Sequence, residues 1–593
     1  AAEASILSFN QQTFAGLEAL TATIDYSSFI CQERANSNYI LQPSGYVALS
    51  GDATLANGRV AKLQVSFIPN IIQFGGQVSS QSLSGADSGF DNKDAFTSMF
   101  TRATSDNYTG EYTLPSGYFR TTEPIDMSTT AVFSSVGQRE GFIHADHLNG
   151  PAIRFRNSYS GLRDIGVTSS ASRIAGAYTF AGRNVGVLYE TDDVPEGSTG
   201  RVLHSKLKDF YLAGHPDGLL HVVGAAFTGY IIAPDLSGTK GHGIVFDRGS
   251  GVGRVNLITG FISGVCNILD GRIGGCAGHS IACGSPTENF STPALRVVID
   301  NIEGGNNATD PAVRYYNSPY YLRGANLALQ NSGSGPTDSG GAMAFIAGRN
   351  IHITNNRVLG ETANAFVVGS YDELPTDGVY ITGFSVISPP ASLDPAILVT
   401  LPAGETIEPI NIHITQGEEG NIVRLVGTDA TMGSSDYRRV ARIFVNGTRP
   451  ILYKTTDQIV NNSNSTVSDT ALRVWLAPFE KLVFSAQIEY SGTSTSDFKV
   501  AIVSPAGSTL SYGPSPTSIK VGSTDSTDIQ GLSGGNLAFG ASSSARVCTI
   551  VGSCVNSSTA GYLNVKWAQL VAEASDTTVH GGASYLEVKS IIT

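Results

Sequence analysis

Several acidic residues of this chain stand at the ends of short apolar segments that alternate in the manner of β-strands. Two carboxyl groups roughly 5–10 Å apart, one acting as acid and the other as base or nucleophile, can cleave a glycosidic bond. Neighbouring strands of a sheet lie ~4.8 Å apart, so acids at equivalent positions one or two strands apart would meet this requirement. The candidate catalytic acids are Glu190, Asp247, Asp270, Asp300 and Glu303.

The first candidate pair lies in the similar segments GVLYE and GIVFD, which end at Glu190 and Asp247. Alternation along a strand places both acids in one outward column. The same alternation directs the side chains of Val187, Tyr189, Ile244 and Phe246 inward. Asp270, which ends the segment NILD, is expected on the next strand of that column. Asp247 therefore ranks first among the candidate acids, since it shares a column with Glu190 and would neighbour Asp270.

A second candidate group consists of Asp300 and Glu303 in VVIDNIEGG, both outward and on either side of Asn301. For any single acid, the alternative is a solvated surface charge or a group that caps a turn. Asp164 and Asp209 are excluded as catalytic candidates because they occupy expected bends, where their side chains would bind the backbone.

Candidate substrate-binding residues are tyrosines, whose rings can stack on sugar faces, and arginines close to the acids. The arginines are Arg248 and Arg272. The tyrosines are Tyr211, Tyr230, Tyr315, Tyr316, Tyr320 and Tyr321. For half or more of these rings, the alternative is packing inside the fold. No histidine group has the spacing of metal ligands, HADH at 144–147 included, and no metal or cofactor is expected.

The composition favours strands and turns. The 593 residues include 67 Gly, and only 15% are charged. A formal net charge of −13 argues against a nucleic-acid partner. No apolar run is long enough to span a membrane, and no signal-peptide pattern opens the chain. The 6 cysteines are too scattered for a disulfide framework and are expected to be free thiols.

A repeated pattern of apolar and bend residues organises the middle of the chain. The tetrapeptide ITGF occurs at 258–261 and again at 381–384, and related segments carry Asp, Asn or Gly at the bend. The expected bends are Asp164, Asp209, Gly260, Asn301, Gly324, Asn355 and Gly383. Residues of these types tolerate tight or left-handed turns.

The intervals between bends indicate the fold. They run from 23 residues (Asn301 to Gly324) to 51 residues (Asp209 to Gly260). Such spacing is typical of a right-handed parallel β-helix in which some coils carry inserted loops. A sandwich or propeller would show paired hairpin turns instead. The longest intervals lie between Asp164 and Asn301, so a site built on loops is expected there.

The entry to the repeat has its own signature. The stretch SGADSGFDNKDAFTSMF predicts a short helix that begins at Asp91 or Asn92. Its apolar face would consist of Ala95, Phe96, Met99 and Phe100. LPSGYF at 114–119 then turns the chain into a strand. This order of "GAD…DN…AF" and "LPxGxY" resembles the start of bacteriophage tailspike proteins, which are receptor-binding proteins with a pectate-lyase-like β-helix.

The ends of the chain strengthen this resemblance. TFAGLEAL and YILQPSGY are similar to a small N-terminal head domain, and the alternating segments after 452 are similar to a C-terminal jelly-roll-like β-sandwich. The sandwich would serve trimerisation or carbohydrate binding. The expected domains are a head (1–70), a neck with a short helix (71–110), the β-helix (111–430), a linker (431–451) and the sandwich (452–593).

The resemblance implies a homotrimer on a phage tail, synthesised in the host cytoplasm and attached to the tail or baseplate through its N-terminal domain. It would bind a bacterial surface polysaccharide (capsule, O-antigen or exopolysaccharide) and act as an endo-glycosidase. Hydrolysis is favoured over β-elimination, for which Asp247 and Asp270 with Arg248 or Arg272 are only a faint match. The alternatives are a spike that binds without cleaving and a secreted β-helix enzyme.

Overall fold

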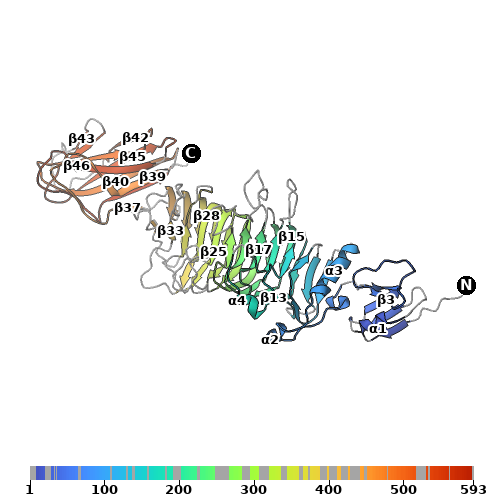
Figure 1. Ribbon diagram of the computed structural model, residues 1–593. Coiled ribbons are helices and arrows are strands. Elements are labelled where there is room, and N and C mark those ends of the chain that lie inside the picture. Colours follow the sequence, from blue (N-terminus) through green and yellow to red (C-terminus); the bar gives the residue numbers. More distant parts are fainter. Residues whose placement is uncertain are drawn as a thin grey trace. The chain divides into compact units, whose positions relative to one another are not determined.

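The computed structural model consists mainly of β-strands, with short helices near its N-terminal end (Figure 1). The chain divides into two compact units. The first contains Ala1–Ile346, Ile351–Val367 and Phe384–Asp394, and the second contains Ala347–Asn350, Val368–Gly383 and Pro395–Thr593. The structure describes residues 8–11, 13–20, 28–32, 34, 37–64, 69–106, 110–127, 131–135, 140–156, 159–179, 183–190, 202–223, 227–247, 266–283, 294–305, 319–334, 343–359, 365–370, 374–387, 397–399, 410–415, 425–427, 441–445, 451–476, 479–515, 529–531, 535–559 and 561–590.

The N-terminal segment forms a 5-stranded sheet with the order β1-β2-β3-β5-β4. Its elements are β1 (Ser8–Gln11), α1 (Phe14–Glu18), β2 (Ser28–Cys31), β3 (Ser37–Leu41), β4 (Ala53–Thr54) and β5 (Val60–Gln64). The buried side chains Leu17, Phe29, Tyr39 and Leu63 form its core. The sheet lies within residues 1–70, where the head domain is expected.

Helix α3 covers the first coil of the parallel strands. The neck elements are η1 (Ile71–Phe74), α2 (Leu83–Ala86) and α3 (Lys93–Ser105). As predicted, the buried face of α3 includes Ala95, Phe96, Met99 and Phe100. The rings of Phe96 and Phe100 meet Phe133 edge-on, with centroids 6.0 Å and 5.7 Å away. A stack of coils needs such a cover, because its end would otherwise expose the core.

A buried arginine ties α3 to the N-terminal sheet. The Arg102 guanidinium contacts a carboxylate oxygen of Asp52 and one of Asp106, each at 2.6 Å. It also donates to the carbonyl oxygens of Ser50 (3.1 Å) and Leu63 (3.0 Å). Because the side chain is only 1% exposed, these bonds must replace the water that it loses on folding.

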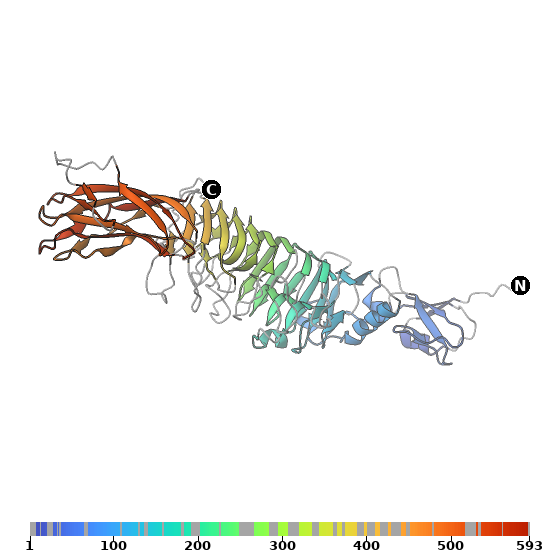
Figure 2. The same cartoon turned by 90° about the horizontal axis from the view of Figure 1, so that it is seen from above.

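The middle of the chain is a right-handed parallel β-helix, as predicted. Each strand pairs in parallel with the equivalent strand of the next coil, for example β7 with β10 and β10 with β13 (Figure 2). The strands of the first coils are β6 (Gly110–Leu114), β7 (Gly117–Thr121), β8 (Ile125–Met127), β9 (Ala131–Ser135), β10 (Gly141–Ala145), β11 (Ile153–Phe155), β12 (Gly161–Arg163) and β13 (Ile165–Ser169).

The following coils contain helix α4 (Ala171–Ala175) and the longer strands. The strands are β14 (Val185–Glu190), β15 (Val202–Lys208), β16 (Tyr211–Ala213), β17 (Gly218–Val223), β18 (Phe227–Ile232), β19 (Asp235–Thr239), β20 (His242–Asp247), β21 (Cys266–Cys276), β22 (Ile281–Cys283), β23 (Ala294–Leu295), β24 (Val297–Gly304), β25 (Tyr320–Ala325), β26 (Ala328–Gln330), β27 (Gly333–Ser334), β28 (Ala344–Thr354), β29 (Arg357–Leu359), β30 (Phe366–Val368) and β32 (Ser385–Ile387).

The chain bends where the sequence predicts, because these residues take the left-handed conformation. The backbone angle φ is 57° at Asp164, 51° at Asp209, 53° at Asn301, 53° at Asn355 and 63° at Gly383. Asp, Asn and Gly tolerate this region better than other residues do. These predicted bends are confirmed.

One predicted bend is wrong, and another was not expected. Gly324 lies inside β25, where it pairs with Ala294, and the left-handed residues that follow it are Asn326 and Asn331, with φ angles of 56° and 49°. Glycine at this position therefore continues a strand. Asp270, expected at a strand end, is itself a left-handed bend with a φ of 56°. The bend expected at Gly260 lies outside the described residues.

Asparagines at successive bends connect the coils through their side chains. The Asn301 amide donates to the Asp270 carboxylate at 2.9 Å, and the Asn331 amide donates to the Asp300 carboxylate at 2.9 Å. The same carboxylate–amide hydrogen bond thus recurs between successive coils. These bonds hold the register between neighbouring coils.

The core of the β-helix consists of inward residues stacked from coil to coil. The predicted inward side chains Val187, Tyr189, Ile244 and Phe246 are all buried, and so are Leu188 and Val245 between them. Val187 aligns with Leu220, and Leu220 aligns with Ile244, so like residues lie over one another. Each coil buries its apolar surface against its neighbours.

All 6 cysteines are buried and free, as expected. Burial raises the pKa of Cys276 and Cys283 to about 12. Their thiols therefore remain protonated at neutral pH and serve as small core residues.

Buried histidines also occupy the coils. His242, His279, Tyr321 and Phe345 form a stack whose successive ring centroids lie 5.2 Å apart. Burial, with a smaller contribution from the Arg183 charge, lowers the pKa of the nearby strand residue His221 to about 3. Burial also lowers the pKa of His242, so the imidazoles of His221 and His242 stay neutral in the folded protein, because a charge there would be desolvated.

The second unit contains further parallel strands and an antiparallel β-sandwich. The parallel strands are β31 (Asp377–Thr382), β33 (Ile397–Val399), β34 (Ile410–Thr415), β35 (Leu425–Gly427) and β36 (Ala441–Val445). The sandwich strands are β37 (Leu452–Tyr453), β38 (Gln458–Val460), β39 (Val467–Leu476), β40 (Lys481–Ser491), β41 (Phe498–Val503), β42 (Thr509–Pro514), β43 (Ile529–Gly531), β44 (Leu537–Phe539), β45 (Arg546–Val555), β46 (Gly561–Gln569), β47 (Thr577–Val579) and β48 (Tyr585–Ser590).

The sandwich has its own core. A 7-stranded sheet faces a 5-stranded sheet of order β39-β46-β41-β44-β43, and their inner side chains form one buried cluster. Tyr490 stacks on Phe498 with centroids 4.1 Å apart, and Phe498 contacts Trp567. No helix in the described part of the chain combines the length and the hydropathy of a membrane span.

We expect Phe100→Ala to destabilise the first coil, because it leaves a cavity between α3 and Phe133. The free energy of unfolding should fall by about 3 kcal/mol. Calorimetry on the variant measures this change, and Leu83→Ala, at a side chain that is 48% exposed, is the control. Equal melting temperatures for both variants would contradict the covering role of α3.

Stability should fall as the pH is lowered from about 6.5 toward 3. The unfolded chain takes up a proton at His221 below pH 6.5, whereas the folded chain does not until about pH 3. One such histidine should lower the free energy of unfolding by about 2 kcal/mol between pH 8 and pH 5. Denaturant titrations of wild type and His221→Leu at both pH values test this. An unchanged pH dependence in the variant would contradict it.

Candidate functional site

A shallow groove of about 460 Å³ runs across successive bends of the β-helix. It is lined by parts of β21, β24, β27 and β29 and by the bends between them. The side chains that give it its chemistry are Asp270, Asn301, Glu303, Asn331, Asn355 and Arg357. The groove begins on the coil of Asp270 and extends past Asn301, beyond the coils where the sequence places the site.

The strand register aligns the charged residues of the groove. Arg272 pairs with Glu303, Glu303 with Gly333, and Gly333 with Arg357, so these residues occupy one outward column on consecutive coils. Each step along the column is ~4.8 Å. Arg272, Glu303 and Arg357 are all exposed. The coil before Arg272 contributes Asp235 to the same column.

The acids in and beside the groove differ in their hydrogen-bond partners. The Asp270 carboxylate accepts a hydrogen bond from Asn301, and the Asp300 carboxylate accepts one from Asn331. Glu303 is exposed, and it forms no ion pair with any other residue that the structure describes. Asp270 is thus oriented by the bend, whereas the Glu303 side chain is available to a ligand.

The second predicted acid group is confirmed in its placement. Asp300 is half-buried and Glu303 exposed, and they stand on either side of the Asn301 bend. Glu303 and Asp270 both line the groove, and Asp300 lies beside it on β24. The structure thus brings together acids that the sequence assigned to different groups.

The first predicted pair, Glu190 and Asp247, lies outside the groove. Glu190 and Asp247 share a column as predicted, with Val223 between them on the intermediate coil. Glu190 is only 7% exposed, and its carboxylate contacts Arg183 and, at 3.4 Å, the Nε of Arg154. Its outward position is therefore occupied by an ion-pair network. The side chain of Asp247 and all of Arg248 lie outside what the structure describes.

Asp270 does not continue the column of Asp247, which corrects the sequence prediction. It lies on β21, which pairs with β18 and β19, whereas β20 pairs with β22. Asp270 and Asp247 therefore belong to different series of stacked strands, β18-β21-β24 and β17-β20-β22. The error arose because Asp270 is a bend residue and not the end of a strand.

Among the tyrosines, two remain accessible for stacking in the described part of the chain. Tyr211 is half-buried and lies one coil before Asp235 in the column of the groove, and Tyr230 is 48% exposed on β18. Tyr320 and Tyr321 are buried, in agreement with the packing alternative. Tyr315 and Tyr316 lie outside the described residues.

Aromatic rings extend the same column toward the N-terminal coils. Tyr118 stacks on Phe142 with centroids 4.7 Å apart, and Phe142 meets Tyr211 edge-on at 6.5 Å. Gly166 stands between them in the register, and a side chain there would collide with the Phe142 ring. The column therefore contains aromatic rings on its N-terminal coils and charged side chains on the coils that follow.

Sequence reasoning missed Asp235, Gly333 and Arg357. The relevant signal is weak: APDLSG at 233–238 begins at a bend in the same way as DFYLAG at 209–214 does, which aligns Asp235 with Tyr211. Nothing in the sequence marks Gly333 or Arg357, because their roles depend on the register with Glu303.

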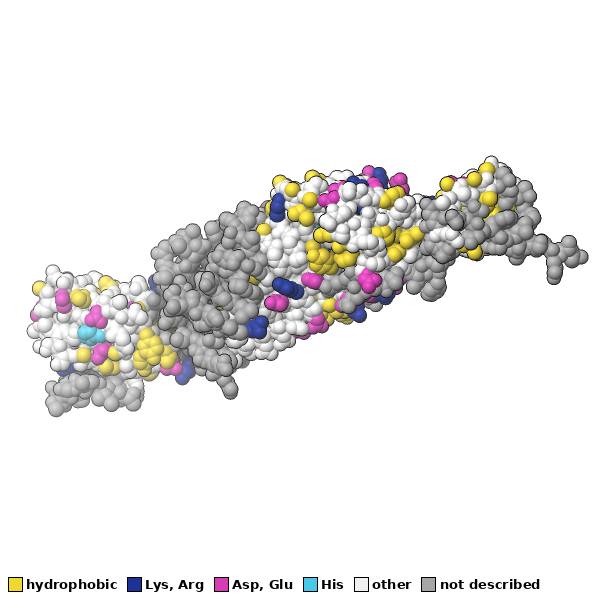
Figure 3. Space-filling model, turned by 90° about the horizontal axis from the view of Figure 1, so that it is seen from below, with side chains coloured by type: hydrophobic (Ala, Val, Ile, Leu, Met, Phe, Trp, Pro, Cys, Tyr) yellow, Lys and Arg dark blue, Asp and Glu magenta, His cyan; other side chains and the backbone are white. Residues whose placement is uncertain are grey.

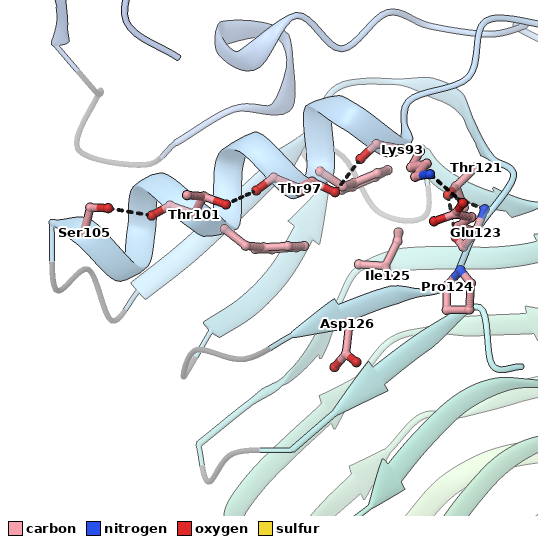
Figure 4. Close-up of a pocket in the computed structure, with 11 residues that line it drawn as sticks. Lys93, Thr97, Thr101, Ser105, Thr121, Glu123, Pro124, Ile125 and Asp126 are labelled. Atoms are coloured by element: carbon pink, nitrogen blue, oxygen red, sulfur yellow. Dashed lines mark hydrogen bonds and ion pairs between the residues drawn. The ribbon is translucent and has the colours of Figure 1, made fainter. Parts of the chain in front are cut away.

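A second cavity, of about 420 Å³, lies between α3 and β8 (Figure 4). Its carboxylates are already paired: Glu123 contacts Lys93, and Asp126 contacts Arg156 at 3.2 Å. Thr97 and Thr101 donate their hydroxyl protons to backbone carbonyls of the helix. This cavity is therefore less suited to acid–base chemistry than the groove at Glu303.

The fold defines the chain as a parallel β-helix protein with an N-terminal neck helix and a C-terminal β-sandwich. No family model and no curated protein matches the sequence. Similar solved structures include the enzymatically active domain of tailspike protein 2 of bacteriophage CBA120, with 11% identity, a TM-score of 0.43, and coverage of 98% of this chain and 92% of that chain.

Other similar structures come from a phage and a bacterium. A tailspike protein from the Acinetobacter baumannii bacteriophage Fri1, a capsular polysaccharide depolymerase, has 11% identity, a TM-score of 0.40, and coverage of 94% of this chain and 100% of that chain. The A-module of a mannuronan C-5 epimerase from Azotobacter vinelandii has 13% identity, a TM-score of 0.41, and coverage of 64% and 99%. Identities this low assign no role to individual residues of this chain.

We expect Glu190→Gln to lower stability and leave activity intact, since its carboxylate neutralises two arginines. Removing one charged partner should lower the free energy of unfolding by roughly 2 kcal/mol. Thermal melts and polysaccharide cleavage assays on the variant measure both effects. A variant with wild-type stability but no cleavage would instead support the Glu190–Asp247 pair as the catalytic site.

Proposed function

We propose that this chain is a phage tailspike that binds a bacterial surface polysaccharide along the outward column of its β-helix and cleaves it in the groove. The observation that supports this most strongly is the position of Glu303 and Asp270 in one groove, with Glu303 in the column of the aromatic rings. The neck motifs of the sequence favour the tailspike class over a secreted enzyme.

The proposed chemistry is hydrolysis by two carboxyl groups. Glu303 donates a proton to the glycosidic oxygen as the bond to the anomeric carbon breaks. Asp270, oriented by Asn301, takes a proton from the water whose oxygen bonds to that carbon. The two acids lie on neighbouring coils and are offset by two residues along the strand. Their backbone positions are therefore roughly 8 Å apart, within the range in which carboxyl pairs act.

Binding without cleavage is the second candidate function. The hydrogen bonds that hold Asp270 and Asp300 in the bends give both acids a structural role, which favours it. Incubation with polysaccharide purified from host bacteria, followed by sizing of the products, separates the two functions. New reducing ends without ultraviolet absorbance indicate hydrolysis, whereas unsaturated products indicate elimination.

Glu303→Gln should reduce cleavage by 10²-fold or more, because the amide cannot donate the proton of a general acid (roughly 10²–10⁴-fold is typical). Its melting temperature should remain that of wild type, since the side chain is exposed. Asp126→Asn, in the cavity beside α3, is the matched control and should remain active. Full activity of the Glu303 variant would contradict the proposed site, and Asp247→Asn would be tested next.

We also propose that the protein forms a parallel homotrimer and attaches to the tail through its N-terminal region. Apolar side chains gather in patches on one face of the described surface (Figure 3). Exposed residues on the β-helix include Leu148 (54%) and Tyr159 (58%). Contact between subunits would cover such patches. A monomer of 62.1 kDa by light scattering at micromolar concentration would contradict the trimer.

A further inference from the structure

The groove contains a gap in its charged column. Glu303, Gly333 and Arg357 follow one another on consecutive coils, and the middle position has no side chain. A Cβ placed on Gly333 would have the carbonyl oxygen of Arg357, at 3.7 Å, as its nearest neighbour. The absence of a side chain therefore leaves open space between an acid and an arginine whose backbone positions are about 10 Å apart across two coil spacings.

Positive charge flanks this gap in a chain that is acidic. The sequence has 37 Lys and Arg against 50 Asp and Glu, yet Arg272 and Arg357 stand in the one column on either side of Glu303 and Gly333. Both arginines are exposed, and neither forms an ion pair with another residue in the described ranges. A guanidinium without an ion-pair partner can bind a carboxylate through two parallel hydrogen bonds, because the two planar groups match in geometry.

The bends beside the column supply neutral polar groups. Asn301, Asn331 and Asn355 line the groove from successive coils, with φ angles of 53°, 49° and 53°. The left-handed backbone conformation fixes the position of the Cβ atom from which each side-chain amide extends. Amides next to a space of this size suit sugar hydroxyl groups, which both donate and accept hydrogen bonds.

We propose that the groove binds an acidic polysaccharide, with the ring of a carboxylate-bearing sugar over Gly333 and its carboxylate on Arg357. The glycosidic bond of that sugar then lies toward Glu303. This inference rests on the proposed function and specifies its substrate class. Gly333 sets the width of the site, and Arg357 distinguishes acidic sugars from neutral ones.

The test uses an array of acidic and neutral bacterial polysaccharides, with each acidic polymer also printed in its carboxyl-reduced form. Glu303→Gln is the probe protein, because it should bind without cleaving. We expect binding to an acidic polymer and an affinity at least tenfold lower for its reduced form. Arg357→Gln, introduced in the same background, should remove this difference. Arg163→Gln, at an outward arginine paired with Glu111, is the matched control and should preserve it.

Gly333→Val tests the gap itself. The larger side chain should block binding of the acidic polymer and leave the melting temperature within a few degrees of wild type, because it meets open space. Wild-type cleavage of a neutral polymer, or equal binding of native and reduced forms, would overturn this inference and leave the proposed function standing. Absence of binding and cleavage by wild type on every polymer would contradict the proposed function and this inference together.

Discussion

The hydrogen-bonded register between successive coils is the constraint on which the rest of this structure depends. Every strand of the β-helix pairs in parallel with its equivalent one coil away, so a shift by one residue would turn the apolar side chains outward. Side-chain bonds at the bends, such as that of Asn301 with Asp270, oppose such a shift. The core, the outward columns and the groove all follow from this alignment.

The register also explains how distant residues of the sequence form one surface. Tyr211, Asp235, Arg272, Glu303 and Arg357 are separated by intervals that differ from coil to coil, yet each occupies the same outward position. The register of the strands is therefore kept although the segments between them differ in length. A linear polymer meets such a column along its length, which suits a chain of sugars better than a small molecule.

The same residue types have different roles where their surroundings differ. Glu190 is enclosed and neutralises Arg154 and Arg183, so its carboxylate contributes to stability. Glu303 stands on an equally outward position but faces an open groove. At the N-terminal end, Arg102 is buried and contacts Asp52, and it ties the helix that covers the first coil to the neighbouring sheet. Burial and available partners decide between structural and chemical roles.

The sequence by itself determined the fold class, because apolar alternation and bend residues such as Asp209 and Asn355 are local signals with a direct backbone cause. It also placed Asp300 and Glu303 on either side of a bend. Only the tertiary structure decided which acids meet, since the pairing of β21 with β24 joins segments distant in the sequence and no local pattern encodes it. Asp270 shows the difference: the sequence identified an acid after an apolar run, and the register made it a bend of the groove.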